Sequence, residues 1–232
     1  HYRVCSGDVA TGRNHKAVYC SSSRLQILIF MINYYGKYEL AGIPVSVSCR
    51  QQYIRKQCVG FETDADPWEN FIITGGDVEY EEKNADRPGY SYGYLESLAF
   101  YRKFCERAAH SNVMLFHSSA IAVDGRAYLF TAPSGTGKST HARLWREMLG
   151  DRAVMINDDK PIIRYIDGDF YVYGTPWNGK HHLDTNARAK IKAICVIGQA
   201  KENSIRKITS SEMLMTVLNQ TLRPSEIDKI DI

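Results

Sequence analysis

Long apolar segments are missing from this 232-residue sequence. The longest apolar run, Ile27–Ile32, is far shorter than the roughly 20 residues that a membrane-spanning helix needs. No charged and then apolar leader with a cleavage site opens the sequence, which begins at His1 rather than methionine, so we expect an N-terminal piece to precede it. We therefore predict a soluble, cytoplasmic protein without a membrane partner.

Paired cysteines and a strong charge excess are missing as well. None of the six cysteines forms a CxxC pair, which disfavours a disulfide framework or a zinc site and favours buried thiols in a reducing compartment. The net charge is only +3 and the basic residues are scattered, so we predict no nucleic-acid partner. With 44% hydrophobic and 24% charged residues, the chain is typical of a globular protein with one good core or two small ones.

The most informative segment is a glycine-rich loop at residues 132–140, Ala-Pro-Ser-Gly-Thr-Gly-Lys-Ser-Thr, directly after the apolar run Ala127–Phe130. It matches the phosphate-binding pattern G-x-x-x-x-G-K-[ST], with Ala132 in place of the first glycine. Its glycines permit a tight turn whose amides point at phosphate oxygens, and the following helix adds its positive end. The pattern predicts a nucleotide-binding site made by Ser134, Gly135, Thr136, Gly137, Lys138, Ser139 and Thr140.

Two side chains of this loop have specific roles in the pattern. Lys138 is placed for the β- and γ-phosphates, and the Ser139 hydroxyl for a magnesium ion. A guanine-recognition motif of the type N/T-K-x-D is missing, which favours ATP over GTP. We therefore predict ATP and Mg²⁺ as the cofactors.

The N-terminal part of the chain has a different texture. Residues 1–90 alternate short apolar runs with Gly, Asp and Asn breaks, which predicts a small β-rich region; the runs are Gln26–Ile32, Ile43–Val47 and Phe71–Thr74. The polar stretch Glu81–Gly93 predicts a loop at its end. Residues 91–232 form the predicted nucleotide-binding domain, which begins with an amphipathic helix over Tyr94–Ala109.

Turn and capping signals locate the later elements. The Asp124-Gly125 pair predicts a two-residue β-hairpin whose register places His117 opposite Ala132, at the mouth of the glycine-rich loop. Three further elements are predicted, namely a helix over Thr140–Leu149, a strand over Ile191–Ile197 and a helix at about Met213–Asn219 behind the capping box Thr209–Glu212.

Two adjacent carboxylates follow the short apolar strand Ala153–Ile156. Asp158 and Asp159 therefore emerge at the carboxyl end of a strand, where ligands bind in open α/β sheets. A second hairpin at Asp167-Gly168 brings the Pro176–Lys180 loop beside them. A carboxylate pair near a phosphate loop suits metal binding and general-base work in phosphoryl transfer.

The loop strand is the second arm of an antiparallel hairpin, and the acidic pair lies on the strand after the loop helix. This combination resembles the HPr serine kinase/phosphorylase family and its relative phosphoenolpyruvate carboxykinase. Four segments within about residues 112–220 carry the resemblance, namely His117–Ala120, Ala132–Thr140, Asn157–Asp159 and Gly174–Lys180.

The resemblance implies an α/β fold of the HPr kinase C-terminal/PEP carboxykinase type, a nucleotide-binding fold with a mixed sheet behind the small β-rich N-terminal region. Lys138 and Ser139 would hold the triphosphate and Mg²⁺. Asp158 and Asp159 would share metal coordination and general-base work on a serine hydroxyl, and His117 would lie near the transferred phosphate or the acidic pair. HPr kinases are oligomers, so a homo-oligomer is expected on the same ground.

The predicted function is an ATP- and Mg²⁺-dependent kinase that transfers the γ-phosphoryl group to a serine hydroxyl of a protein or peptide. A non-catalytic nucleotide-binding module with a regulatory or scaffold role, and a small-molecule phosphotransferase of carboxykinase-like type, stay open as alternatives. Trp177 and Lys180 are candidates for contact with the substrate or phosphate, but the core is the more usual place for a residue such as Trp177, and a solvated surface for one such as Lys180.

Overall fold

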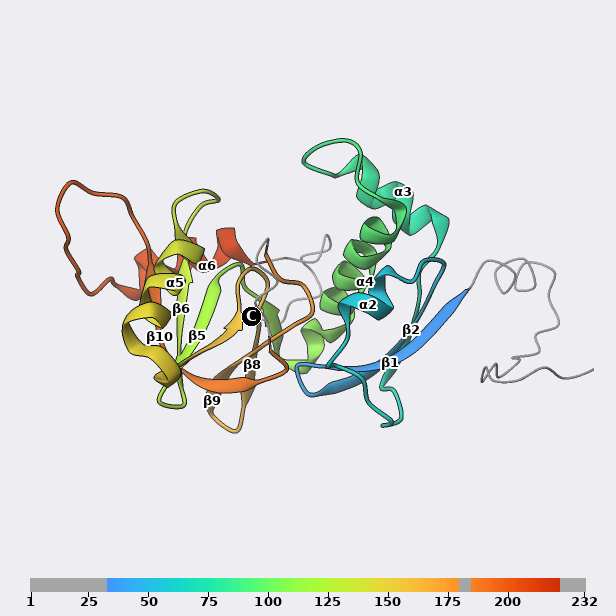
Figure 1. Cartoon of the computed structure of the whole chain (residues 1–232), viewed down its shortest axis with the longest axis horizontal. Coiled ribbons are helices and arrows are strands. Elements are labelled where there is room, and N and C mark those ends of the chain that lie inside the picture. The colour runs from blue at the N-terminus through green and yellow to red at the C-terminus, as the bar shows by residue number, and fades with distance from the viewer. Residues whose placement is uncertain (1–32, 180–184, 222–232) are drawn as a thin grey trace, which may run out of the picture. The chain divides into compact units, whose positions relative to one another are not determined.

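Two mixed β-sheets form the framework of the computed structural model, which describes residues 33–179 and 185–221. In the smaller sheet, β1 (Tyr34–Leu40) pairs antiparallel with β2 (Ile43–Cys49), and β2 pairs parallel with β3 (Glu69–Ile72). Three helices accompany this sheet, namely α2 (Tyr53–Gln57), α3 (Gly75–Lys83) and α4 (Tyr92–Ala108) (Figure 1).

The larger sheet has the strand order β4-β8-β9-β10-β6-β5-β7. Its strands are β4 (Val113–Leu115), β5 (Ser119–Val123), β6 (Arg126–Thr131), β7 (Ala153–Asn157), β8 (Ile162–Ile166), β9 (Asp169–Tyr173) and β10 (Arg188–Val196). Only β6 and β10 pair in parallel, and the other neighbours are antiparallel. The remaining elements are η1 (Ala109–Ser111), α5 (Lys138–Leu149), η2 (Gly150–Arg152) and α6 (Ser210–Gln220).

The coarse fold prediction is confirmed, because the structure is α/β with mixed sheets and a small β-rich region near the N-terminus. Both predicted hairpins are present in the predicted register, with Val123 opposite Arg126 and Ile166 opposite Asp169. At each turn the Asp-Gly pair has positive φ at both positions, which matches the right-handed twist of the flanking strands. The expected run Gln26–Ile32 lies outside the described residues.

The region around residue 80 differs from the prediction. The expected loop Glu81–Gly93 is shortened at both ends, because α3 continues to Lys83 and α4 begins at Tyr92. Thr74 and Asp77 form a reciprocal capping box, in which the Thr74 amide donates to Asp77 Oδ2 at 2.9 Å. This box stabilises the first turn of a helix that has little apolar periodicity of its own.

Helix α4 packs on the smaller sheet rather than standing apart from it. Its buried residues share one hydrophobic core with β1 and β2, and that core also takes in Ile162 and Tyr173 from the larger sheet and Trp177 after it. Phe100 and Phe104 both contact Phe71 of β3 edge-on. The predicted division at residues 90 and 91 stays a prediction, but the contacts of α4 associate this helix with the small sheet.

Three of the four cysteines in the described residues are buried, as the sequence predicts, and Cys195 is half-buried. Cys49, Cys58 and Cys105 are buried, and burial raises the pKa of the Cys49 thiol to about 12. Among residues 33–179 and 185–221, no helix is both long and apolar enough to cross a bilayer.

A buried carboxylate fixes α4 to the end of β2. Glu96 is only 1% exposed, and its two oxygens accept hydrogen bonds from the backbone amides of Arg50 at 2.6 Å and Gln51 at 2.8 Å. Burial raises the pKa of this carboxyl, and the two amide hydrogen bonds oppose that shift. The folded state therefore binds the Glu96 proton more tightly than the unfolded chain does.

Glu96→Ala removes both acceptors, so we expect the free energy of unfolding to fall by about 1.5–3 kcal/mol. Glu96→Gln keeps one acceptor oxygen and should lose less. Because the raised pKa makes the charged form costly in the fold, the advantage of the wild type over Glu96→Gln should shrink as the pH rises past about 4.5. Urea unfolding between about pH 4 and pH 7 measures both effects. An alanine variant as stable as the wild type would contradict the first, and a difference between the wild type and Glu96→Gln that does not change with pH would contradict the second.

Candidate functional site

Three strand ends meet at one edge of the larger sheet. Strand β5 lies between β6 and β7 and is antiparallel to both, so its amino end adjoins their carboxyl ends. Ser119 pairs with Phe130 of β6, and Ala120 pairs with Asn157 of β7. The glycine-rich loop after β6 and the acidic pair after β7 are therefore brought to the same edge, as the sequence predicts.

The glycine-rich loop has the backbone of an anion cradle. Gly135 and Gly137 have φ values of 79° and 117°, which favour glycine. Gly137 is the N-cap of α5 and supplies no side-chain cap, and the first backbone bond of the helix runs from His141 N to Gly137 O at 2.9 Å. The amides of residues 138–140 therefore have no acceptor within the helix, and they carry its positive end.

Lys138 lies under this loop. Its side chain is only 8% exposed, and its Nζ donates to the carbonyl oxygen of Ala132 at 3.0 Å. Burial lowers the pKa of Lys138, whereas the charges of Asp159 and Asp158 oppose that shift. The ammonium has three donor positions, so this lysine can donate to phosphate oxygens as well.

Asp158 lies on the side of the loop helix. Its carboxylate is nearly buried and accepts a hydrogen bond from Ser119 Oγ at 2.7 Å. Asp158 and Ser139 both line a cavity of about 340 Å³ between α5 and β7. The described residues contain no group of three or more His, Cys, Asp or Glu that could hold a metal ion by themselves.

Asp159 points to a different set of partners. Its Oδ1 lies 3.2 Å from His117 Nε2, and its Oδ2 lies 2.5 Å from Lys160 Nζ. Burial alone would raise the pKa of Asp159, but the hydrogen bonds and charges of His117 and Lys160 outweigh it and lower the pKa to about 2. The carboxylate is therefore ionised at neutral pH.

His117 is held by its backbone near the start of the loop. Its carbonyl oxygen accepts from Thr131 Oγ1 at 3.0 Å, and its amide donates to Gln220 O, the last residue of α6, at 2.8 Å. The predicted proximity of His117 to the acidic pair is thus present in the structure. The α6 contact was not foreseen, because nothing in the local pattern links residues 117 and 220.

The side chain that fixes the acidic pair is Asn157, for which sequence reasoning gave no role. Asn157 is fully buried, and its Oδ1 accepts from the amides of Asp159 at 2.8 Å and Lys160 at 2.7 Å. Its Nδ2 donates to the carbonyl oxygens of Thr175 at 2.9 Å and Trp177 at 3.2 Å. The Asn-Asp-Asp sequence at a strand end, typical of side-chain-stabilised turns, is the signal that could have identified it.

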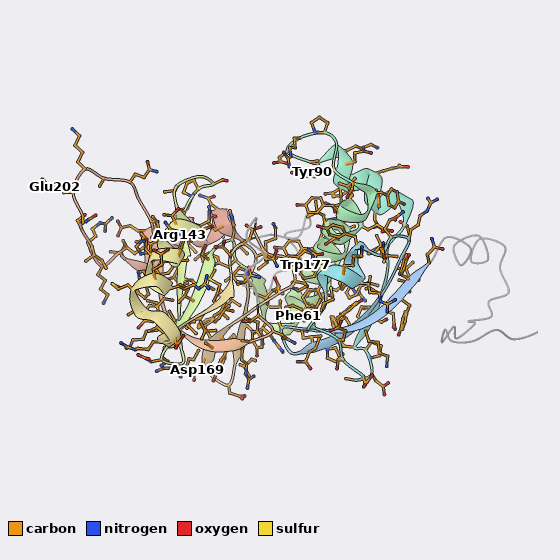
Figure 2. The ribbon with its side chains drawn as sticks, viewed as in Figure 1. Phe61, Tyr90, Arg143, Asp169, Trp177 and Glu202 are labelled. Atoms are coloured by element: carbon orange, nitrogen blue, oxygen red, sulfur yellow. The ribbon has the colours of Figure 1, made fainter. Side chains whose placement is uncertain are left out.

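Trp177 lies in the core, which favours the structural interpretation of this residue. This residue (labelled in Figure 2) is 3% exposed, its ring contacts Phe100 and Tyr101, and its Nε1 donates to Ser97 O at 3.1 Å. A ring buried in this way has no open face on which a nucleotide base could stack. Lys180 lies outside the described residues, and its predicted contact stays a prediction.

The His117–Asp159 pair gives a pH-dependent coupling that can be measured. Because the folded pKa of Asp159 is depressed, its stabilising contribution is present above the ordinary value of 3.8 and is lost as the pH falls toward about 2. A double-mutant cycle with His117→Ala and Asp159→Asn should give a coupling of roughly 1 kcal/mol or less at about pH 5, discounted for solvent screening. Urea unfolding should show the coupling shrinking at about pH 2.5. A coupling that is absent at pH 5, or equal at both values, would refute this assignment.

Comparison with known proteins adds no family assignment. No protein-family model matches the chain, and no curated protein matches it significantly. Function is therefore inferred below from the residues of this site and their geometry.

Proposed function

We propose that this protein is an ATP- and Mg²⁺-dependent kinase that transfers the γ-phosphoryl group to a serine hydroxyl of a protein or peptide. One observation carries the proposal, namely that the uncapped amino end of α5, the buried Lys138 and the acidic pair occupy one edge of the sheet. We further propose that the fold is of the HPr kinase/PEP carboxykinase type, on the basis of the antiparallel partner of the loop strand and the position of the acidic pair.

The residues present suit a triphosphate. The amides at the start of α5 are donors without acceptors in the helix, and the loop backbone leaves open space around both glycines. Lys138 offers a buried cation with donors to spare beyond its bond to Ala132. Together they form a cradle that favours several negative charges in a small volume.

The same edge suits magnesium, with Ser139 and Asp158 as its two protein ligands. Mg²⁺ is usually held by one or two carboxylates together with substrate phosphates and water, so a three-residue cluster is not needed. The hydrogen bond from the Ser119 hydroxyl fixes the orientation of the Asp158 carboxylate. When bound, the ion would neutralise charge on the phosphates and hold them in line for transfer.

Asp159 and His117 are suited to activate the serine hydroxyl that accepts the phosphoryl group. We assign Asp159 as the group that receives the proton from the serine hydroxyl as the new oxygen–phosphorus bond forms and the bond to the departing ADP breaks. Its low pKa makes it a weak base, which suffices because phosphoryl transfer passes through a loose transition state. The imidazole of His117 positions the carboxylate through its 3.2 Å contact.

Replacing each aspartate by asparagine should therefore impair a different property of the enzyme. Both Asp158→Asn and Asp159→Asn should lower phosphoryl transfer by about 10²–10⁴-fold. Only Asp158→Asn should also raise the Mg²⁺ concentration needed for half-maximal rate, whereas Asp159→Asn should bind ATP with Mg²⁺ as the wild type does. Asp169→Asn, which alters an aspartate of β9 paired with Lys190, is the matched control and should keep full activity.

The assay uses γ-labelled ATP and Mg²⁺ in an extract of the protein's own cells, with phosphopeptides identified by mass spectrometry. A serine phosphopeptide that disappears with either site variant supports the kinase. If the protein binds ATP but shows no phosphoryl transfer that requires the aspartates, the result would instead favour the regulatory or scaffold module. Label found only on a small metabolite would favour the small-molecule phosphotransferase.

A further inference from the structure

The cavity beside Ser139 and Asp158 extends along α5 to two arginines that the proposed phosphoryl transfer does not use. Arg143 and Arg146 line it together with those two residues, and Ala142 and Met155 give it an apolar wall. Positions 139, 143 and 146 follow the i, i+4, i+7 spacing of one helix face. The cavity is therefore polar at the phosphate end, apolar in its wall and cationic at its far end.

The two arginines differ in what they are bound to. Arg143 (labelled in Figure 2) is exposed and forms an ion pair with Glu147 at 2.5 Å, one helical turn away. Arg146 is half-buried, and its guanidinium has no ion pair or hydrogen bond with any residue in the described ranges 33–179 and 185–221. A guanidinium presents five donors in a planar fork that matches a carboxylate. Arg146 is thus a cation in a cavity with its donors unused.

We propose that this cavity receives an acidic side chain of the acceptor segment, with Arg146 as the residue that selects it. The inference rests on the proposed kinase function and names its substrate class, a serine with a nearby Asp or Glu. Arg146 is seven positions after Ser139, which at about 1.5 Å per helical residue is roughly 10 Å. An extended peptide advances about 3.3 Å per residue, so the acidic residue lies roughly two or three residues from the acceptor serine.

Several features make a carboxylate on a peptide a better occupant than the nucleotide. The triphosphate already has the loop amides and Lys138 as donors, and neither Lys138 nor residues 134–137 line the cavity. The apolar wall of Ala142 and Met155 suits the methylene groups of an Asp or Glu side chain. Arg–carboxylate pairing then supplies direction as well as charge.

The test begins from phosphosites mapped in the extract with wild-type protein, and continues with peptides copied from one site in acidic and neutral versions. The mapped sites should carry Asp or Glu within about three residues of the serine. Arg146→Gln should raise KM for the acidic peptide about tenfold, with KM for ATP unchanged and little effect on the neutral peptide. Arg146→Glu should favour peptides in which Lys replaces the acidic residue. Arg126→Gln, at the far end of β6, is the control and should match the wild type.

Two peptide comparisons identify the source of the negative charge. An amidated C-terminus should leave KM unchanged, and a phosphoserine in place of the Asp should bind no better than the Asp itself. A gain with either a free C-terminus or phosphoserine overturns the side-chain assignment. Circular dichroism and the unfolding midpoint check that Arg146→Gln is folded, since glutamine is a good helix former.

Failure of this inference is distinguishable from failure of the kinase. Two outcomes would overturn the acidic subsite but not the kinase function. One is wild-type transfer to serine with no preference for acidic peptides, and the other is an Arg146→Gln variant in which only KM for ATP changes. If no phosphoryl transfer requires Asp159, the proposed kinase function is wrong, and the acidic subsite that rests on it is wrong as well.

Discussion

The hydrogen bonds of the Asn157 amide hold the site together. Its oxygen accepts hydrogen bonds from the backbone amides of the two residues that follow Asp158, and its nitrogen donates to carbonyl oxygens of the segment after β9. The side chain is fully buried, so any of these groups left without its partner would cost about 1–3 kcal/mol. The backbone that carries both carboxylates is thereby held by one residue that need not contact a substrate.

The segment after β9 depends on the same amide and transmits its constraint to α4. Thr175 Oγ1 donates to Lys160 O at 2.7 Å, and Trp177 donates through its indole to Ser97 of α4. Gly179 passes so close that a Cβ there would lie 3.1 Å from the carbonyl oxygen of Asp158. The Gly-Thr-Pro-Trp-Asn-Gly stretch thus acts as a support for the acidic pair, which gives its Thr, Trp and second Gly physical roles without contact to a ligand.

Short sequence motifs predicted those features of the fold that depend on neighbouring residues. The Asp-Gly turns fixed two strand registers because few other residues tolerate positive φ at both positions, and the Thr209 capping box placed the start of α6. The Thr74–Asp77 box was equally local and was overlooked, because Asp stands where Glu or Gln is usual. The bonds of Asn157 to Thr175 and Trp177 and the backbone contact of His117 with α6 join residues 18 to 103 positions apart, so no local pattern could reveal them.

Charge balance explains why the proposed site needs a metal ion and a second cation. Asp158 and Asp159 lie within electrostatic reach of Lys138, whose buried ammonium is the cation under the loop. Lys160 and His117 are already engaged by Asp159, so they contribute little to a further anion. A triphosphate entering this edge would add several negative charges beside two carboxylates, and repulsion at these distances is costly in a partly buried site. In the proposed kinase, Mg²⁺ held by Ser139 and Asp158 would offset that repulsion near the phosphates. Farther along α5, the proposed acidic acceptor group would need its own cation, and Arg146 has no hydrogen-bond or ion-pair partner among residues 33–179 and 185–221.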